Sequence, residues 1–249
     1  MNSDFINVNA WSQRNDLLLN AKKTKAICFS NSCISSATPA LIANGETITL
    51  DDDVVNLGLK LRKDMSWGAH CNRISSRVFS GLPSLWQQGN VIGRNMRISL
   101  VKSLLLPHFT YCCEVFVFGL DACCRKTLNR AFDACIRFAY GLRRRDDLHD
   151  YRNELLGCDI IGFLKCRALL FLHKIVLTGT PDYIYEKLRF AQSTRTANLI
   201  QPRTSVARTS KSLLFNGISY YNSIPTQVRQ SRSGAGWVVR VSVWVRDLR

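Results

Sequence analysis

Apolar side chains recur three and four positions apart along much of the chain, which is the spacing of one face of a helix. The two clearest stripes are His70, Ile74, Val78 and Leu82, and then Leu128, Phe132, Cys135 and Phe138. The second stripe predicts a helix over residues 122–140. We expect Gly141 to end it, because glycine readily adopts the left-handed conformation found at helix ends. Helices are also predicted over residues 4–19, 93–117, 151–156, 161–178 and 183–190.

Within residues 93–117 the expected apolar face consists of Ile98, Val101, Leu104 and Leu105. Pro107 lacks a backbone N–H, so we expect it to kink or end this helix.

Most strand patterns lie in the first quarter of the chain; one further alternation, of Val239, Val241, Val243 and Val245 with larger or polar residues, occurs near the end of the chain without an evident partner strand. Residues 26–29 form a short apolar run, and the dipeptide Asn44-Gly45 separates two further apolar runs. Asn-Gly favours a two-residue type I′ turn, so a β-hairpin is predicted there. Val55, Leu57, Leu59 and Leu61 then alternate with polar or small residues, which predicts a single strand with one buried face.

These patterns divide the chain into three segments. Residues 1–66 are expected to be a small α+β segment, residues 67–194 a helical region, and residues 195–249 a basic tail that is poorly ordered or ordered on a polyanion. The predicted fold class is therefore α+β, mainly α-helical, with a small antiparallel β portion at the N-terminal end.

Composition narrows the possible classes of protein. A hydrophobic share of 46% and a mean hydropathy of −0.05 exclude a disordered chain. Apolar runs such as 104–106 and 115–117 are far below the ~18 residues of a membrane-spanning helix. No signal peptide is recognised, so we expect an intracellular protein, nuclear or cytoplasmic, with no membrane partner.

The charge points to a polyanionic partner. Lys and Arg total 34 and Asp and Glu total 18, which gives +16. Arginine supplies 23 of the basic residues, and nucleic acid is the first partner to consider. Nine basic residues and one acidic residue lie from Arg195 onward, so half of the surplus lies in the tail.

Two clusters could bind metal ions. Ten cysteines include the adjacent pairs Cys112-Cys113 and Cys123-Cys124, but zinc ligands are usually separated by two to four residues, so we interpret the cysteines as mostly buried thiols. Asp51, Asp52 and Asp53 could hold Mg²⁺ or form a polar turn. We favour the turn, since Mg²⁺ sites need ligands that converge from different elements. We therefore predict no metal site and no catalytic residue. No phosphate-binding loop, nucleophile elbow or zinc-protease motif is present, and no small-molecule substrate is indicated.

Basic side chains on the predicted helices are the best candidates for contact with phosphate groups. They are Arg73, Arg77, Arg94, Arg97 and Lys102, followed by Arg137, Arg143, Arg144 and Arg145 at the end of one helix. Each alone could be part of an ordinary solvated helix face, or a cation favoured at a helix C-terminus. Together they favour nucleic-acid contact.

Several blocks, in order, resemble reverse transcriptases of non-LTR retrotransposons, especially the jockey-like and I-like groups. The blocks are WSQRNDLLLNAKKTKAICFS (11–30), IANG (42–45), VVNLG (54–58) with Leu61, Trp67 and His70, RISLVKSLLLPHFTY (97–111) and AFDACIRFAYGLRRR (131–145). Weaker matches follow at Asp182, Tyr183, Leu188, Arg195, Ile224 and Pro225. Asp16 stands where the family usually has glycine. The resemblance covers residues 1–228 and does not extend into the tail from 229.

The resemblance implies the end of a palm, a primer-grip hairpin and a thumb-like helical region. It implies that Leu57 and Gly58 steer the primer end, and that Lys23 or Lys25 lies near the incoming nucleotide. The family's polymerase holds Mg²⁺ with an aromatic-x-Asp-Asp turn and a further aspartate. No Tyr or Phe here is followed by x-Asp-Asp.

The hypothesis is therefore a fragment similar to an RNA-directed DNA polymerase of a transposable element. It would retain contact with an RNA/DNA template–primer, would be inactive as an enzyme on its own and would bind no cofactor. Two alternatives stay open: a host-recruited, non-enzymatic nucleic-acid-binding or interaction module, and a pseudogene fragment without function.

Overall fold

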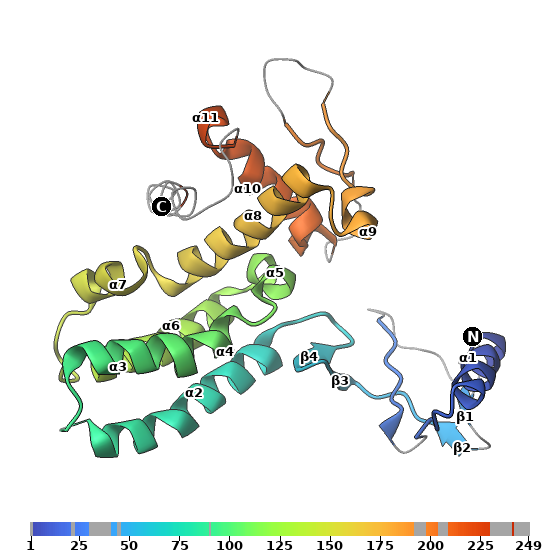
Figure 1. Ribbon diagram of the computed structural model, residues 1–249, viewed down its shortest axis with the longest axis horizontal. Helices are drawn as coiled ribbons and strands as arrows, with labels where there is room; N and C mark the ends of the chain where they lie inside the picture. Colours follow the sequence, from blue (N-terminus) through green and yellow to red (C-terminus); the bar gives the residue numbers. More distant parts are fainter. Residues whose placement is uncertain are drawn as a thin grey trace. The chain divides into compact units, whose positions relative to one another are not determined.

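The computed structural model describes residues 2–20, 23–29, 41–43, 46–89, 91–191, 198–203, 209–229 and 241. The chain forms two compact units, residues 1–70 and residues 71–249, which are described separately below (Figure 1). The fold is α+β: antiparallel strands occur near the N-terminus and helices make up most of the remainder.

The first unit contains α1 (Asn2–Arg14), β1 (Leu41–Ala43), β2 (Glu46–Ile48), β3 (Asp53–Asn56), β4 (Leu59–Arg62) and the start of α2 (Gly68–Gln88). The second unit contains the rest of α2, then α3 (Arg94–Leu100), η2 (Val101–Leu105), α4 (Leu106–Thr110), α5 (Cys113–Phe116), η3 (Val117–Gly119), α6 (Ala122–Tyr140), α7 (His149–Leu156), α8 (Ile160–Thr178), α9 (Asp182–Tyr185), η4 (Thr209–Lys211), η5 (Leu213–Gly217), α10 (Ile218–Ser223) and α11 (Thr226–Arg229). The predicted division after residue 66 lies four residues before the boundary between the units.

Two separate two-stranded sheets form in the first unit. β1 pairs with β2 in an antiparallel hairpin in which Ala43 lies opposite Glu46, so the predicted hairpin at 41–48 is confirmed. Its turn residues, Asn44 and Gly45, lie outside the described residues. The strand predicted over 26–29 is reduced to one parallel bridge between Ala26 and Leu50.

The single strand predicted through residues 55–61 is wrong, because the chain reverses there. β3 and β4 pair with Asn56 opposite Leu59. Leu57 and Gly58, which connect them, have φ values of 46° and 87°. Two successive left-handed residues make a type I′ turn, which follows the right-handed twist of the strands. The apolar alternation continues through this turn in the sequence and so hides it.

Both predicted helical stripes are buried in the structure. His70, Ile74, Val78 and Leu82 of α2 and Leu128, Phe132, Cys135 and Phe138 of α6 are each at most 4% exposed. α6 begins where Asp121 accepts a hydrogen bond of 2.7 Å from the backbone N–H of Cys124, and it ends at Gly141, whose φ is 68°. Side-chain capping and a left-handed glycine satisfy backbone groups that a helix leaves unpaired at its ends.

The helix predicted through residues 93–117 is interrupted. A π-helical turn, η2, lies between α3 and α4, and Pro107 falls in the first turn of α4, where its missing N–H costs little. Val101 and Leu105, four positions apart, are both buried, at 1% and 3% exposure. Leu104 was predicted on the same face as these two residues but is 51% exposed, because the wider turn rotates it outward.

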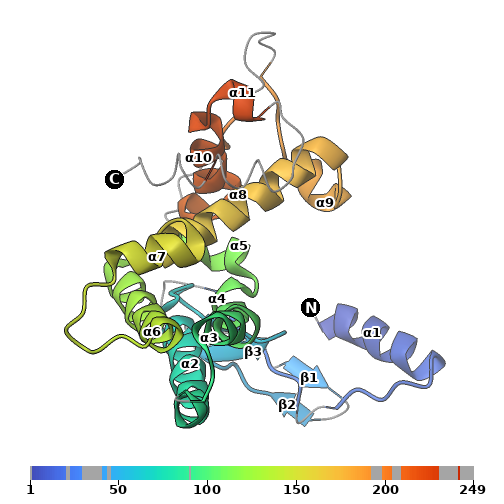
Figure 2. The same cartoon turned by 60° about the vertical axis from the view of Figure 1, so that its left-hand side comes forward.

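The C-terminal part of the second unit packs around α8. Figures 1 and 2 show α10 lying alongside α8, and the two helices are joined where His173 Nδ1 lies 2.9 Å from the Tyr221 hydroxyl. Burial raises the pKa of Tyr221 to about 12, so its hydroxyl keeps its proton. Residues 209–229 belong to the segment for which the charge predicted poor order. They carry apolar side chains such as Ile218 and Ile224, which are buried. Residues 230–240 and 242–249 of that segment lie outside the described residues.

No single helix among the described residues is long and apolar enough to cross a membrane. One bent pair, Arg94–Thr110 with Cys113–Gly119, meets that criterion by length and composition together.

Candidate nucleic-acid interface

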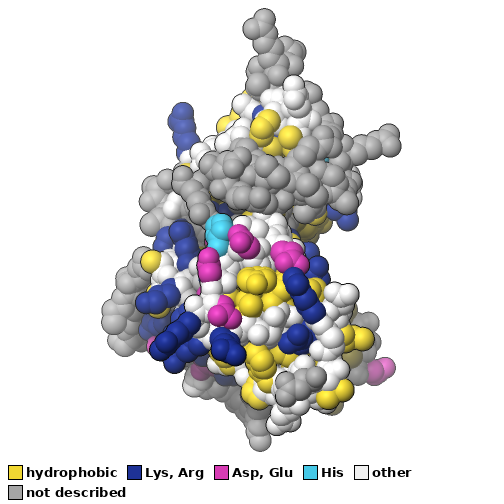
Figure 3. All heavy atoms as spheres, turned by 90° about the vertical axis from the view of Figure 1, so that its left-hand side faces the viewer, with side chains coloured by type: hydrophobic (Ala, Val, Ile, Leu, Met, Phe, Trp, Pro, Cys, Tyr) yellow, Lys and Arg dark blue, Asp and Glu magenta, His cyan; other side chains and the backbone are white. Residues whose placement is uncertain are grey.

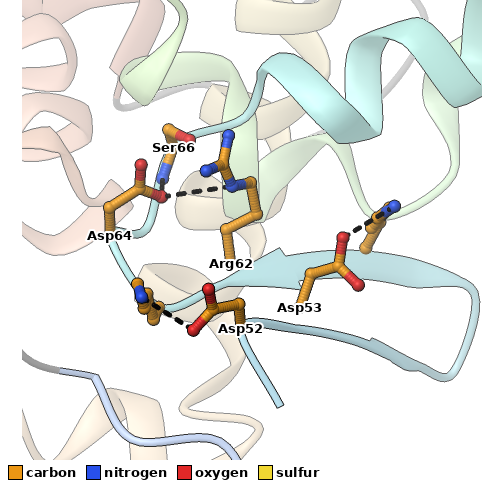
Figure 4. Close-up of polar contacts among 7 residues, drawn as sticks. Asp52, Asp53, Arg62, Asp64 and Ser66 are labelled. Atoms are coloured by element: carbon orange, nitrogen blue, oxygen red, sulfur yellow. Dashed lines mark hydrogen bonds and ion pairs between the residues drawn. The ribbon is translucent and has the colours of Figure 1, made fainter.

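Each carboxylate of the acidic cluster at residues 51–53 forms an ion pair with a lysine. Asp51 forms an ion pair with Lys25 at 2.9 Å, Asp52 with Lys63 at 2.7 Å and Asp53 with Lys60 at 2.8 Å. Figure 4 shows Asp52 and Asp53 directed toward different partners rather than toward each other. The hydrogen bond donated by Lys60 holds the pKa of Asp53 below its usual range, and the hydrogen bond that Lys25 donates to Asp51 raises the pKa of Lys25. These contacts agree with the interpretation of the segment as a polar turn.

A fourth carboxylate, Asp64, belongs to the turn after β4. It accepts a hydrogen bond of 2.9 Å from the backbone N–H of Ser66, which lowers its pKa, and it lies 3.8 Å from Arg62 (Figure 4). The acidic residues at this end of the hairpin are thus paired with local cations or backbone donors.

This pairing bears on the prediction that Lys23 or Lys25 lies near an incoming nucleotide. The Lys25 ammonium is held by Asp51, whereas Lys23 is exposed. Residues 1–70 contain seven basic and seven acidic side chains, while residues 71–249 contain 27 basic and 11 acidic ones. The whole surplus of +16 therefore belongs to the second unit, and the first unit has no net attraction for a polyanion.

The predicted primer-contact residues, Leu57 and Gly58, form the tip of the β3–β4 hairpin, and Leu57 is 82% exposed. His70 has a structural role beside them. Its Nδ1 accepts a hydrogen bond of 3.3 Å from the backbone N–H of Lys60 in β4, and Trp67 packs edge-on against its ring. The tryptophan and histidine of the family-like motif therefore fix the hairpin to the first turn of α2.

Most cysteines are core residues. Six of the nine described cysteines are buried: Cys71, Cys113, Cys124, Cys135, Cys158 and Cys166. Burial raises the pKa of Cys113 and of Cys135 to about 12, so both stay thiols. Within the described part of the chain, no three His, Cys, Asp or Glu side chains gather as metal ligands would. Cys33 lies outside the described residues.

Three of the predicted phosphate-contact residues lie apart from the others. Arg73 and Arg77 lie on α2, and Arg77 is close enough to His108 that, after partial burial, its charge lowers the pKa of that histidine. Lys102 is an exposed residue of η2. These side chains contribute positive charge to the helical unit without forming one site.

The other six predicted residues gather around the end of α6, and we call them the α6-end arginines: Arg94, Arg97, Arg137, Arg143, Arg144 and Arg145. Figure 3 shows the side of the molecule on which α3, α7 and the loop after α6 lie. Lysine and arginine side chains gather on that side, with hydrophobic side chains between them and acidic ones nearby.

Arg94 is the most constrained of the six. Its Nη2 lies 2.8 Å and 3.0 Å from the two carboxylate oxygens of Glu154 on α7, and its guanidinium lies 4.6 Å from the centre of the Tyr140 ring. Partial burial, and next the charge of Glu154, raise the pKa of Tyr140, which also packs on Tyr151. Arg94 therefore joins α3 to α6 and α7, and Glu154 already offsets its charge.

Arg97 reaches the glycine that ends α6. A Cβ added to Gly141 would lie 3.0 Å from Arg97 Nη1, closer than ordinary van der Waals contact. The positive φ of 68° favours glycine here, and a Cβ would in addition require the Arg97 guanidinium to move by a few tenths of an ångström. Cations at a helix C-terminus are favoured by the partial negative charge of the helix dipole.

Arg137 lies one turn before the end of the same helix, and its Nη2 donates to the backbone oxygen of Arg144 at 3.3 Å. The loop itself is fixed by Asp146, which accepts a hydrogen bond of 2.7 Å from the backbone N–H of Arg143. The side chains of residues 143–145 are exposed. Among the described residues, no carboxylate forms an ion pair with any α6-end arginine other than Arg94.

The sequence patterns did not reveal the aromatic side chains of this region. Trp86 of α2 is 44% exposed and packs edge-on against Phe138 of α6, with ring centroids 5.5 Å apart. The charge clusters pointed to this end of α6, but Trp86 comes from another helix and had no separate signal.

No protein-family model matches this chain, and neither a search of curated proteins nor a search of solved structures found a match.

Proposed function

We propose that this chain is a fragment similar to an RNA-directed DNA polymerase of a mobile element, and that its helical unit retains a surface for template–primer contact without polymerase activity. The observation that carries the proposal is the group of α6-end arginines, five of which form no ion pair among the described residues. Residues 73–145 contain twelve basic and three acidic side chains, so the surrounding helices add to the attraction for phosphates.

The proposal assigns binding to the second unit and a lesser role to the first. The order of sequence blocks supports the relation to reverse transcriptases, and the charge distribution supports nucleic acid as the partner. We also propose an intracellular location, nuclear or cytoplasmic, where such a partner is found. The proposal includes no bound cofactor, membrane partner or small-molecule substrate.

Binding is tested with the full chain and a fluorescein-labelled RNA–DNA hybrid of about 20 base pairs, by fluorescence polarisation between about 50 and 200 mM salt. Because each neutralised phosphate contributes about −0.9 to the slope of log affinity against log salt, we expect a slope between about −2 and −5. A flat response would remove the nucleic-acid proposal.

The matched variants locate the surface. The triple variant R143Q/R144Q/R145Q is expected to flatten the slope, since three unpaired charges are lost. Lys63→Gln removes an exposed charge that Asp52 already neutralises, so it should leave the slope unchanged. Equal effects of the two variants would contradict the proposed location.

A second candidate, a fragment without function of its own, is favoured by the apolar surface of the first unit. Ile6, Val8, Trp11, Leu17 and Leu18 are all more than half exposed, and the two sheets have two strands each. Exposed apolar groups and unpaired strand edges promote association. This candidate predicts concentration-dependent aggregation by light scattering together with a flat salt response in the binding assay.

A further inference from the structure

Asp146 is an acidic residue that directly follows the three consecutive arginines of the α6-end group. Its Oδ2 accepts a hydrogen bond of 2.7 Å from the backbone N–H of Arg143, and its own N–H donates to the backbone oxygen of Arg143 at 3.2 Å. The two hydrogen bonds close residues 143–146 into a turn with Arg144 and Arg145 at its centre. In the described part of the chain, no ion pair joins the Asp146 carboxylate to an arginine side chain. The carboxylate therefore acts on the backbone of the turn.

The turn is also fixed at both of its ends. On the α6 side, Nη2 of Arg137 donates to the backbone oxygen of Arg144 at 3.3 Å, and the N–H of Leu142 donates to the backbone oxygen of Arg137 at 3.0 Å. On the α7 side, Leu148 is buried. In Figure 2 the loop between α6 and α7 projects beyond the ends of both helices. A short loop with fixed ends thus carries the three arginines.

The side chains of the turn, unlike its backbone, are open to a ligand. Arg143, Arg144 and Arg145 are all exposed, and no described carboxylate forms an ion pair with them. A loop that becomes ordered on a ligand loses conformational entropy at each residue whose backbone is fixed, which weakens binding. Because the backbone of this turn is already fixed in the free chain, that loss on binding is reduced.

We propose that Asp146 is a positioning residue of the nucleic-acid surface: by holding the turn at residues 143–146, it presents the exposed side chains of Arg143, Arg144 and Arg145 to phosphate groups as one preformed cluster. This inference rests on the proposed function and gives an acidic residue a favourable part in binding a polyanion. Charge alone predicts the opposite, since a carboxylate repels phosphate. The two explanations therefore differ in the sign of the effect when the carboxylate is removed.

The test is the affinity of the full chain for the same labelled hybrid. Asp146→Ala should weaken binding about three- to tenfold, because the turn is released and must be ordered again on the ligand. Asp150→Ala is the matched control. Asp150 is an exposed acid four residues further along, no more than about 14 Å away, and its side chain forms no hydrogen bond or ion pair among the described residues. Its removal should tighten binding by up to about twofold, because only a repulsive charge is lost.

A conservative variant separates the hydrogen bond from the charge. In Asp146→Asn the amide oxygen still accepts the N–H of Arg143 while the negative charge is gone, so this variant should bind at least as tightly as the wild type. Hydrogen exchange of the free chain reports the turn directly. The amide of Arg143 should exchange faster in Asp146→Ala than in the wild type, and at the wild-type rate in Asp150→Ala.

The outcomes distinguish this inference from the proposed function. If the wild-type chain shows no salt-dependent binding, the proposed function fails and this inference fails with it. If the wild type binds and Asp146→Ala binds no more weakly, the proposed function stands and the positioning role is overturned. An equal loss in Asp146→Asn, or unchanged exchange at Arg143 in Asp146→Ala, would also overturn it.

Discussion

Asp121 shows how much one side chain contributes to this fold. Its carboxylate accepts the backbone N–H of Cys124 at 2.7 Å and so begins α6, the helix that supplies much of the buried core and carries the arginine group at its other end. This hydrogen bond holds the pKa of Asp121 below the usual value of 3.8. A depressed folded-state pKa means that the carboxylate stabilises the fold above the unfolded-state value and that the contribution disappears as pH falls through the folded-state value.

We therefore predict that Asp121→Ala lowers the free energy of unfolding by about 1 kcal/mol near neutral pH. The difference from wild type should shrink as pH falls below about 4, because the wild-type carboxylate becomes protonated. Urea unfolding at several pH values measures this. Asp121→Asn is the matched control: asparagine caps without a titrating group, so its advantage over alanine should persist in acid. A deficit in Asp121→Ala that does not change with pH would contradict the capping explanation.

One backbone position adopts a conformation that its residue type rarely takes. Asp16, at the position where the resembled family usually has glycine, has a φ of 56°, in the left-handed region that favours glycine. The identity of the ion-pair partners was not predictable in this way. Lys25 and Asp51 are far apart in sequence, and only the folded chain brings them to 2.9 Å.

Among the elements, the β3–β4 hairpin depends on a turn whose sequence suits it poorly. Leu57 has a φ of 46°, and for a residue with a Cβ the left-handed conformation costs about 1–2 kcal/mol. Asn-Gly is the preferred pair for this turn type, and the chain already has Gly58 at the second position.

Leu57→Asn should accordingly stabilise the hairpin by about 0.5–1 kcal/mol. Native-state hydrogen exchange of the amides between β3 and β4 measures local stability, and these amides should exchange more slowly in the variant. Leu57→Val should exchange faster than wild type, because a β-branched residue is more strained in this conformation. Slower exchange with valine than with asparagine would mean that the turn is not the weak point of the hairpin.

The π turn η2 is the second element that the sequence concealed. Within it Leu105 is buried at 3% exposure, while Leu104 faces outward at 51% exposure. An uninterrupted α-helix places both residues near the same face, as the periodicity predicted.

This register gives a matched pair of variants. Leu105→Ala should lower the free energy of unfolding by about 2–5 kcal/mol, because it removes buried methyl groups and leaves a cavity. Leu104→Ala should change it by no more than about 0.5 kcal/mol, the usual limit at an exposed site. Thermal or urea unfolding distinguishes them. Similar losses in both variants would show that the helix runs through residues 101–105 without the wider turn.

At the scale of the whole molecule, the two units differ in net charge. Residues 1–70 are formally neutral, and the entire surplus of +16 lies in residues 71–249. Long-range attraction for a polyanion depends on net charge and its distribution, so the helical unit is the part expected to meet nucleic acid first.

The sequence and the ion pairs of the acidic cluster support a prediction about catalysis. With an RNA template, an annealed primer, deoxynucleoside triphosphates and Mg²⁺, the purified chain should extend no primer. No aromatic-x-Asp-Asp segment is present, and Asp51, Asp52 and Asp53 are each bonded to a lysine. An active reverse transcriptase on the same template–primer is the control. Primer-dependent incorporation by this chain would overturn the view that it is inactive alone.

The sequence by itself determined the helical stripes of α2 and α6, the glycine at the end of α6, the hairpin at 41–48 and the sign of the charge. These features depend on neighbours within a turn or two of the chain, and periodicity records such neighbours directly. Only the tertiary structure decided that the lysines near residues 51–53 are neutralised and that Leu104 faces outward. It also decided that Arg97 and Arg137 meet at residues 141–144 with buried, unpaired Nε atoms. Burial and ion pairing depend on which distant segments pack together, and local spacing carries no record of that.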